Sequence, residues 1–177
     1  MSGGTSFPAA EQTALSLCRG CLSWQGFGFL PHEAEAYACP SCGAMQAAGD
    51  ADPSADELAA RIGEPRACWG PVRLRRRWLP EAGEVVATEA GLLFLPGEVG
   101  EAWRGWNSRE PAGRLLGDPG AFFVDGRAIE AVRLRRWRLL RRRAVVERRD
   151  AEPLAFEIPR GREAAVRAAI ADGGRTR

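Results

Sequence analysis

Short apolar or alternating segments dominate the second half of the chain. Val72, Leu74 and Trp78 are expected on one face of a strand, with arginines on the other face. Similar runs, bounded by Gly, Pro or Asp, predict further strands at residues 84–88, 91–95, 121–125, 129–137, 144–149 and 154–158. Apolar residues at helical spacing predict a terminal helix over residues 162–172. The pattern therefore predicts a mainly β fold, of the α+β type, with six or seven antiparallel strands and a C-terminal helix.

Three stretches carry a resemblance to a known family: VATEAGLLFLP at residues 86–96, AIEAVRL at 128–134 and LAFEIPR at 154–160. With the order of elements, they resemble the bacterial pleckstrin-homology-like (PH-like) domains. The resemblance implies a partly open β-barrel of two nearly orthogonal antiparallel sheets over residues 67–173, capped by the terminal helix. In that family, basic residues between the first two strands bind lipid. Residues 79–84 (LPEAGE), which we expect at this connection, are acidic, and this departure argues against phosphoinositide recognition.

Two short cysteine pairs precede the predicted β domain. Each pair is a C-x2-C motif, and 17 residues separate the inner cysteines. The four residues are Cys18, Cys21, Cys39 and Cys42. Pairs at this spacing predict a closed four-thiolate metal site, because each tight turn offers two sulfurs and the intervening chain folds back. The stretch resembles the zinc ribbons, which implies one structural Zn²⁺ within residues 15–46. Gly20 and Gly43 suit the tight turns.

Alternatives to a four-cysteine zinc site stay open at this level. Two disulfides would need an oxidising compartment, and iron would use the same tetrahedral sulfur geometry. His32, the sole histidine, lies between the pairs and could replace a cysteine ligand. Because four better-spaced thiols are present, we interpret His32 as a solvated loop residue. Zinc ribbons act as nucleic-acid binders, protein docking modules or structural caps, so the motif predicts a metal and leaves the function open.

A linker with a short helix is predicted between the two units. It covers residues 47–66, where a capping box is expected, with Ser54 as N-cap and Glu57 at the third helical position. Two apolar residues four apart give the helix one apolar face, and Gly63 ends it. We expect this helix to pack between the two units. Residues 1–14 are small and polar and are expected to form a flexible N-terminus.

Charge divides the chain into two unlike parts. Residues 1–64 carry two arginines against eight acidic residues, whereas residues 65–177 carry 23 arginines against 15 acidic residues. The overall net charge of +2 therefore hides an acidic unit and a basic unit. All basic residues are arginine, a bias that GC-rich coding produces by itself, so only the placement of charge is informative. We find neither a membrane-spanning run nor a signal-peptide pattern, and we expect a cytoplasmic protein, peripheral to the membrane at most.

The arginine-rich run at residues 133–149 is the first candidate contact surface. It holds nine arginines with Trp137, Leu139 and Leu140 interleaved, and we place Arg141, Arg142 and Arg143 at a hairpin tip that Arg138 and Trp137 join. Such a tip would contact the phosphates of lipid or nucleic acid. Alternatively, the run forms the solvated outer faces of two strands, with arginine stems covering apolar surface.

The insertion between Pro96 and Pro119 is the second candidate surface. Trp103 and Trp106 lie there beside arginines, a combination that suits base stacking or anchoring at a membrane interface. The alternative is that both tryptophans fold back over an open sheet edge. Cys68 is the unpaired thiol, and we interpret it as a buried packing residue.

Few features of the sequence suggest an enzyme. It lacks a phosphate-cradling glycine loop, a G-x-S-x-G turn and a spare histidine to act as a base. We therefore expect a non-enzymatic, zinc-binding adaptor or scaffold, whose β domain docks on a protein partner or an anionic membrane surface and whose ribbon engages another protein. No small-molecule substrate is expected. The alternative is a nucleic-acid-binding zinc-ribbon protein that uses Arg19, Trp24 and the arginine run. In a third arrangement, opposite charges hold the two units together.

Overall fold

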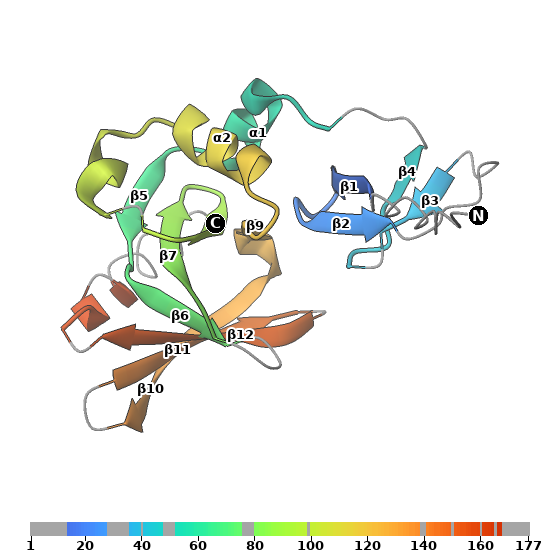
Figure 1. The fold of residues 1–177 in the computed structure, drawn as a ribbon. Coiled ribbons are helices and arrows are strands. Elements are labelled where there is room, and N and C mark those ends of the chain that lie inside the picture. The colour runs from blue at the N-terminus through green and yellow to red at the C-terminus, as the bar shows by residue number, and fades with distance from the viewer. Residues whose placement is uncertain are drawn as a thin grey trace, which may run out of the picture.

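The computed structural model describes residues 14–27, 36–39, 41–47, 52–75, 80–98, 100–138, 141–149, 151–159, 161–164 and 166–167. Within these ranges the chain forms one large antiparallel sheet, two small hairpins, two α-helices and two short 3-10 helices (Figure 1). The mainly β class predicted from the sequence is therefore confirmed.

Eight strands from the second part of the chain form the large sheet. Their bounds are β5 (Pro65–Cys68), β6 (Val72–Arg75), β7 (Pro80–Thr88), β8 (Gly91–Pro96), β9 (Phe122–Asp125), β10 (Ile129–Arg138), β11 (Arg141–Arg148) and β12 (Ala151–Pro159). The order across the sheet is β10-β11-β12-β6-β7-β8-β9, and β5 pairs with β7. β9 and β10 follow each other in sequence but lie at opposite edges, so the sheet does not close into a barrel. β5 is an additional strand, which its initial proline and its short length concealed.

Strands β7, β8 and β9 are buried on both faces. Successive side chains of a strand point to opposite faces, so neighbouring residues enter different cores. On β8, Phe94 belongs to the first core while Leu93 and Leu95 belong to the second. On β9, Val124 and Phe123 divide in the same way. This double burial explains why the sequence of β8 is a continuous apolar run rather than an alternating one.

The first core is lined by the inner faces of the large sheet. Phe94 stacks on Phe122 with ring centroids 5.2 Å apart, and Trp69 meets Phe156 edge to face at 6.2 Å. Strands β6, β10, β11 and β12 contribute one face only to this core, and their other face is turned away from it. Val166, in the helical residues near the C-terminus, is fully buried there.

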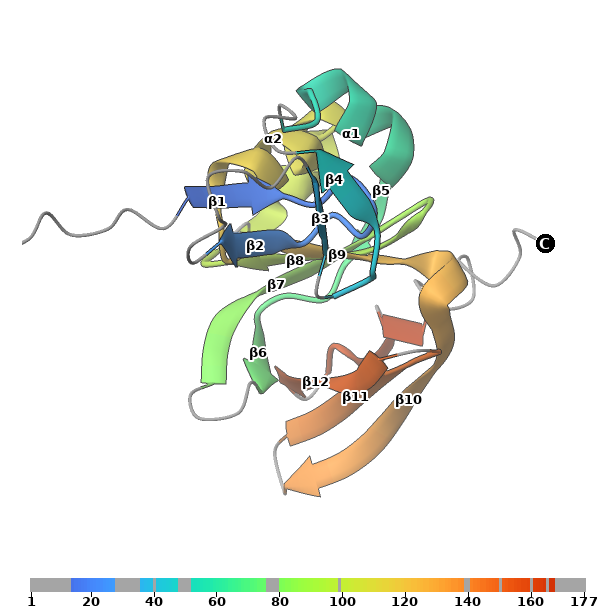
Figure 2. The ribbon, with the colours of Figure 1, turned by 90° about the vertical axis from the view of Figure 1, so that its right-hand side faces the viewer.

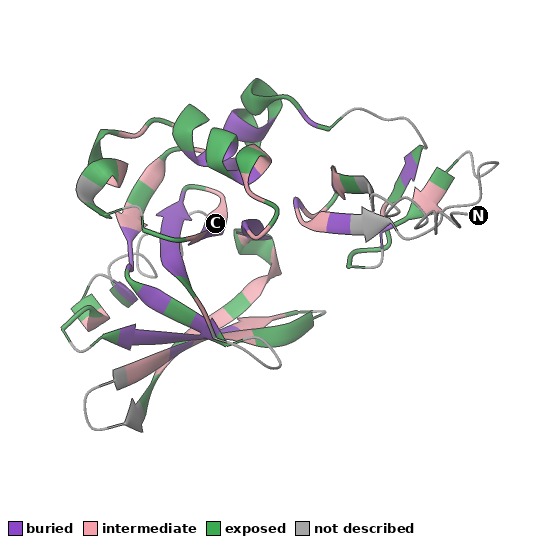
Figure 3. Ribbon diagram, in the orientation of Figure 1, coloured by how far each residue is buried: buried purple, intermediate pink, exposed green. Residues whose placement is uncertain are grey.

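The second core lies on the other face of β7, β8 and β9. Helices α1 (Ala55–Ile62) and α2 (Arg109–Gly117) cover that face together with residues of the first cysteine turn (Figures 1 and 2). Buried residues, coloured purple in Figure 3, follow the sheet strands and the inward sides of both helices. The two helices and the N-terminal unit therefore lie on one side of the molecule, away from β10, β11 and β12.

Helix α1 has the capping box that the sequence predicted. The N–H of Glu57 donates to Ser54 Oγ (3.2 Å), and the N–H of Ser54 donates to the Glu57 carboxylate (2.7 Å). Gly63 ends the helix with φ of 73°, a conformation that other residues adopt only under strain. Leu58 and Ile62 are buried in the second core, so the helix packs between the two units as expected.

Helix α2 was not predicted. The insertion contains a 3-10 helix (Gly100–Gly105) followed by α2, which buries Pro111, Ala112 and Leu115. One proline and two glycines within nine residues obscured the helical period. Proline is tolerated here because it lies in the first turn, where its missing N–H has no intrahelical partner.

The connection between β6 and β7 corrects a second expectation. β7 begins at Pro80, so the acidic stretch that we expected at this connection lies in a strand. The actual connection is residues 76–79, RRWL in sequence, which is basic and lies outside the described residues. Gly83 resembled a loop signal, but a Cβ there would lie 2.3 Å from the carbonyl oxygen of Leu95. The close approach of β8 therefore requires this glycine within the strand.

The arginine triplet does not form the hairpin tip that we expected. Arg141 begins β11 and pairs with Arg138, so the turn is residues 139–140, outside the described residues. Arg142 and Arg143 pair with β10 on one side and β12 on the other. Leu139 and Leu140, which follow β10 in the sequence, carry no turn signal, whereas Arg142 and Arg143 are half-buried within β11.

Several expectations fall outside what the structure describes. These are the placements of His32 and Trp78, the end of the terminal helix at residues 168–172, and the side chains of Arg138 and Arg141. The flexible N-terminus also lies outside, except for Ala14, which begins a strand.

Candidate metal centre

The four cysteines of the two C-x2-C pairs converge on one point. All four Sγ atoms lie within 4.8 Å of one another, with Cys18 and Cys42 at 3.7 Å and Cys21 and Cys39 at 3.8 Å. A tetrahedral ion with metal–sulfur bonds of about 2.3 Å holds its sulfurs roughly 3.8 Å apart, whereas a disulfide requires about 2.05 Å. The arrangement therefore fits one metal ion and does not fit two disulfides.

Both cysteine pairs lie on the same kind of turn. The N–H of Leu22 donates to the carbonyl of Cys18 (2.8 Å), and the N–H of Gly43 donates to the carbonyl of Cys39 (2.7 Å). Each turn connects the strands of a two-stranded hairpin. The strands are β1 (Ala14–Leu17) with β2 (Trp24–Phe27), and β3 (Ala36–Ala38) with β4 (Met45–Ala47). The two hairpins and their turns form the N-terminal unit, which we call the ribbon.

Gly20 is required by lack of space rather than by backbone conformation. A Cβ on Gly20 would lie 2.6 Å from the Cβ of Ala44 and 3.0 Å from the Sγ of Cys42. Its N–H points at the Sγ of Cys18, at 3.3 Å. The glycine thus lets the two turns approach closely enough for their sulfurs to share one ion.

Leu22 is the site residue that the sequence analysis missed. It has φ of 54°, the left-handed conformation that Gly43 adopts in the second turn with φ of 73°. A branched residue in this conformation costs on the order of 1 kcal/mol. Leu22 is fully buried in the second core, and burying a leucine contributes more than that cost. The signal was available, because Leu22 follows Cys21 as Gly43 follows Cys42.

Burial and hydrogen bonding act unequally on the thiols. Burial by itself would raise the pKa of Cys18, but hydrogen bonds from turn N–H groups and neighbouring thiols bring that pKa below its ordinary value. Burial raises the pKa of Cys21 and of Cys39. Since thiolates bind the metal, loading the site displaces thiol protons, and metal affinity falls as pH falls.

Helix α1 holds the first cysteine turn from outside. The guanidinium of Arg61 donates to the carbonyl oxygens of Arg19 and Gly20, which lie between the two cysteines of that turn. Arg19 also forms an exposed ion pair with Glu57 at 3.4 Å. Such an exposed pair contributes little, but the two carbonyl contacts fix the turn to the helix. No sequence pattern pointed to Arg61 in this role.

The ribbon covers the edge strand β9. Ser23 forms an antiparallel bridge with Phe122, and the N–H of Phe123 donates to the carbonyl of Leu22 (3.5 Å). The indole N–H of Trp24 donates to the carbonyl of Leu115 in α2 (2.8 Å). The two units are therefore packed on each other, although not through the opposite charges that the third arrangement above invoked. The contact is made mainly by apolar burial and backbone hydrogen bonds rather than by opposite charge.

The predicted contact residues lie in two separate places. Trp103 and Trp106 are half-buried and pack against the second core, each with an arginine guanidinium 5.9 Å from its ring. Arg142 instead bonds Glu163, near the C-terminus, at 3.0 Å. Burial lowers the pKa of Arg143, which is half-buried on β11.

Cys68 is buried away from the metal site, as expected. Its thiol donates to Glu84 (3.0 Å), and the same carboxylate accepts from the N–H of Gly100 (3.2 Å). Burial, together with the hydrogen bond to Glu84, raises the pKa of Cys68 to about 12. Since the thiolate is the reactive form, this thiol is unreactive at neutral pH.

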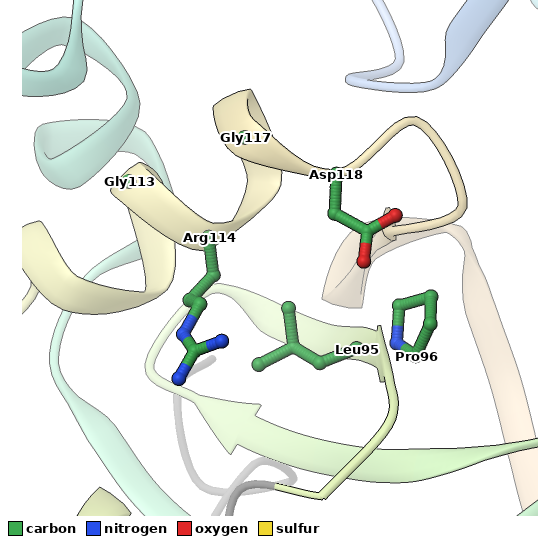
Figure 4. A pocket seen from close by; sticks show the side chains of 6 residues that line it. All are labelled: Leu95, Pro96, Gly113, Arg114, Gly117 and Asp118. Atoms are coloured by element: carbon green, nitrogen blue, oxygen red, sulfur yellow. The ribbon is translucent and has the colours of Figure 1, made fainter.

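One small pocket lies between α2 and the end of β8 (Figure 4). It has a volume of about 240 Å³, and the side chains of Arg114 and Asp118 stand over Leu95 and Pro96. Glycines of α2 complete the lining. We assign it no role in the metal centre.

Comparison with known proteins adds no family: no protein-family model matches this chain, and no curated protein is significantly similar to it. In the part of the chain that the structure describes, neither helix is long and apolar enough to cross a membrane. Fold and site together define a mainly β protein with an N-terminal four-cysteine cluster suited to one metal ion.

Proposed function

We propose that this chain is a non-enzymatic adaptor in which a structural zinc ribbon and a PH-like β domain present two separate protein-binding surfaces. The observation that carries the proposal is the distribution of surface types. Leu15 (49% exposed) and Met45 (66% exposed) are the exposed large hydrophobic residues of the described chain, and both lie on ribbon strands. Exposed arginines gather on β6 and β10, at the other side of the molecule. Exposed apolar side chains favour a protein contact.

Zinc is the metal that we propose. Four thiolates are the ligand set of structural zinc sites, and they fill every tetrahedral position. The S···S distances of 3.7 and 3.8 Å support this choice, although iron would accept the same geometry. Metal analysis of the purified chain separates the two.

A PH-like domain is supported by the strand order. β6 lies between two antiparallel groups, β7-β8-β9 and β12-β11-β10, whose outer strands are unpaired with each other. An open antiparallel sheet with this strand order supports the partly open arrangement that the resemblance implies. The helical residues that bring Val166 into the first core fit the expected C-terminal helix.

The nucleic-acid alternative relied on Arg19 and Trp24 of the ribbon. In the fold, Arg19 pairs with Glu57, and the indole of Trp24 bonds α2 and packs against the second core. Both side chains therefore already have partners inside the chain, which weighs against a nucleic-acid surface on the ribbon.

An anionic membrane surface is a second candidate partner for the β domain. The observation in its favour is the corrected β6–β7 connection, which is RRWL in sequence and therefore basic. Flotation with neutral and anionic vesicles tests it. Capture by anionic vesicles that is lost in Arg76→Ser with Arg77→Ser would support the membrane contact.

The adaptor proposal is tested by placing a photo-crosslinking residue at one position of the full-length chain at a time. Position 45 reports on the ribbon and position 138 reports on the end of β10. We expect each to capture a different protein in cells. Position 109, on the exposed surface of α2, is the control. If neither position captures a protein above the control, or both capture the same single protein, the two-surface adaptor is wrong.

A further inference from the structure

The outer face of the large sheet differs in composition and in cover between its two halves. Over β7, β8 and β9 that face is apolar and is covered by α1, α2 and the ribbon. Over β6, β12, β11 and β10 it is rich in arginine, and the helices and the ribbon lie on the other side of the molecule (Figures 1 and 2). We call this second region the arginine face, made of Arg73, Arg75, Arg133, Arg135 and Arg143 with Glu147 and Glu157.

Strand register places these charges in a continuous row. Arg135 of β10 lies opposite Arg143 of β11, which lies opposite Glu157 of β12, which lies opposite Arg73 of β6. Adjacent strands are about 4.8 Å apart, so the row crosses roughly 14 Å of sheet. The alternation that buries Val72, Leu74, Ala144 and Phe156 turns every member of this row to the opposite face.

Two glutamates hold arginines of this face in place. Nε of Arg75 donates to Glu157 (2.8 Å), and Nε of Arg133 donates to Glu147 (3.0 Å). Glu157 is only 8% exposed, whereas Arg73, Arg75, Arg133 and Arg135 are all exposed. A guanidinium fixed by one carboxylate loses less conformational entropy when it meets a second one. Two guanidinium groups of the arginine face are thus preorganised, and the face carries five arginines against two glutamates.

We infer that the arginine face docks a carboxylate-rich protein segment in extended form. This inference rests on the adaptor proposal and names the chemistry of one partner. An extended chain advances about 3.3 Å per residue, so roughly five residues would follow the row. Arginine pairs with carboxylates in a bidentate manner, which suits glutamate and aspartate side chains.

Protein is favoured over nucleic acid and membrane by the composition of this face. The described outward side chains of these strands offer no aromatic platform for base stacking, but Trp137 of β10 lies outside the described side chains, so single-stranded DNA serves as a competitor in the test. The described face also lacks a large exposed apolar side chain to enter a bilayer.

The test measures binding of the full-length, metal-loaded chain to a fluorescent peptide of alternating glutamate and serine. A peptide with glutamine in place of glutamate is the ligand control. We expect salt-sensitive binding that Arg73→Glu with Arg135→Glu weakens by about tenfold, because two attractions become repulsions. Arg104→Glu with Arg109→Glu changes the net charge equally on the helix side and should leave binding unchanged. Metal content and melting temperature verify that each variant is folded.

Three results would overturn the inference. The first is that the wild-type chain does not bind the glutamate peptide. The second is that the helix-side variant weakens binding as much as the face variant. The third is that anionic vesicles or single-stranded DNA bind in place of the peptide. Each leaves the adaptor proposal to its own test, because crosslinking at positions 45 and 138 detects a protein partner of any chemistry. Loss of crosslinked partners together with intact peptide binding would instead overturn the adaptor and keep the face as an isolated binding surface.

Discussion

The two halves of the large sheet differ in what lies against their outer face. β7, β8 and β9 are apolar on both faces and need cover on each, which the first core supplies on one side and the ribbon with two helices on the other. β6, β10, β11 and β12 are apolar on one face only, and arginine keeps the other face in water. The difference shows that the ribbon is part of the fold of the first half and is no part of the second.

The contact between the ribbon and the first half of the sheet gives a bound metal ion a role in the fold beyond the ribbon. A ribbon on a flexible linker would lose its metal without consequence for the β domain. Here Leu17 and Leu22 flank Cys18 and Cys21, and both leucines are buried in the second core. The ribbon also pairs with β9, which is otherwise an unprotected edge. A metal ion held by the four cysteines would therefore contribute to the stability of one half of the sheet.

Metal removal should have the largest effect. A structural zinc site supplies on the order of 10 kcal/mol of folding free energy. We expect a strong chelator, or Cys39→Ser, to lower the melting temperature of the whole chain in a single transition and to expose the second core to a hydrophobic dye. Calorimetry with parallel zinc measurement checks this. Cys68→Ser, which alters the one cysteine outside the cluster, should leave the metal content unchanged. A β domain that melts at an unchanged temperature without metal would contradict the shared core.

A matched pair of leucine substitutions separates the two cores. Leu22 and Leu74 are both fully buried, the first in the second core and the other in the first core. Either change to alanine should cost about 2–5 kcal/mol of unfolding free energy. Only Leu22→Ala should speed zinc release to a chromogenic chelator, because the Leu22 side chain anchors the first cysteine turn in the second core. Equal release rates at a temperature where both variants are folded would show that the turn does not depend on the core.

The sequence predicted most of the fold, and each failure has a physical cause. Strand positions and the capping box of α1 follow from local rules, so they were found. β5 and α2 were missed, since proline or glycine hides their periodicity and tertiary burial stabilises them. The β6–β7 connection was misplaced because Gly83 resembles a turn residue, while its actual cause is the close approach of β8, which no local pattern contains.

The metal ligands were predictable and the support of the site was not. Spacing alone identifies the two C-x2-C pairs, because the turn that presents two sulfurs is local. The contact of Arg61 with the carbonyls of Arg19 and Gly20 joins residues about forty positions apart, a separation that depends on how α1 packs. The arginine face likewise requires the register of four strands, two of which are far apart in the sequence.

Trp24 offers a smaller test of how the ribbon is held. Its indole N–H donates to the carbonyl of Leu115, which joins the ribbon to α2. Trp24→Phe keeps an aromatic ring and removes this donor, and should lower the unfolding free energy by about 1 kcal/mol. Denaturant titration measures the change. Pairing it with Leu115→Ala in a double-mutant cycle asks whether the indole of Trp24 and the side chain of Leu115 are coupled, and simple additivity would show that they stabilise the fold independently.

The smallest effect is expected on the arginine face. Arg73 and Leu74 are neighbours on β6, but Arg73 is exposed on the outer face and Leu74 is fully buried. Arg73→Ala should change the unfolding free energy by at most about 1 kcal/mol, the scale of a cross-strand charge pair with Glu157. Denaturant titration beside Leu74→Ala, with its loss of about 2–5 kcal/mol, provides the comparison. If Arg73→Ala were as destabilising as Leu74→Ala, the charges would belong to the fold, and the outer face would have no surplus attraction to offer a partner.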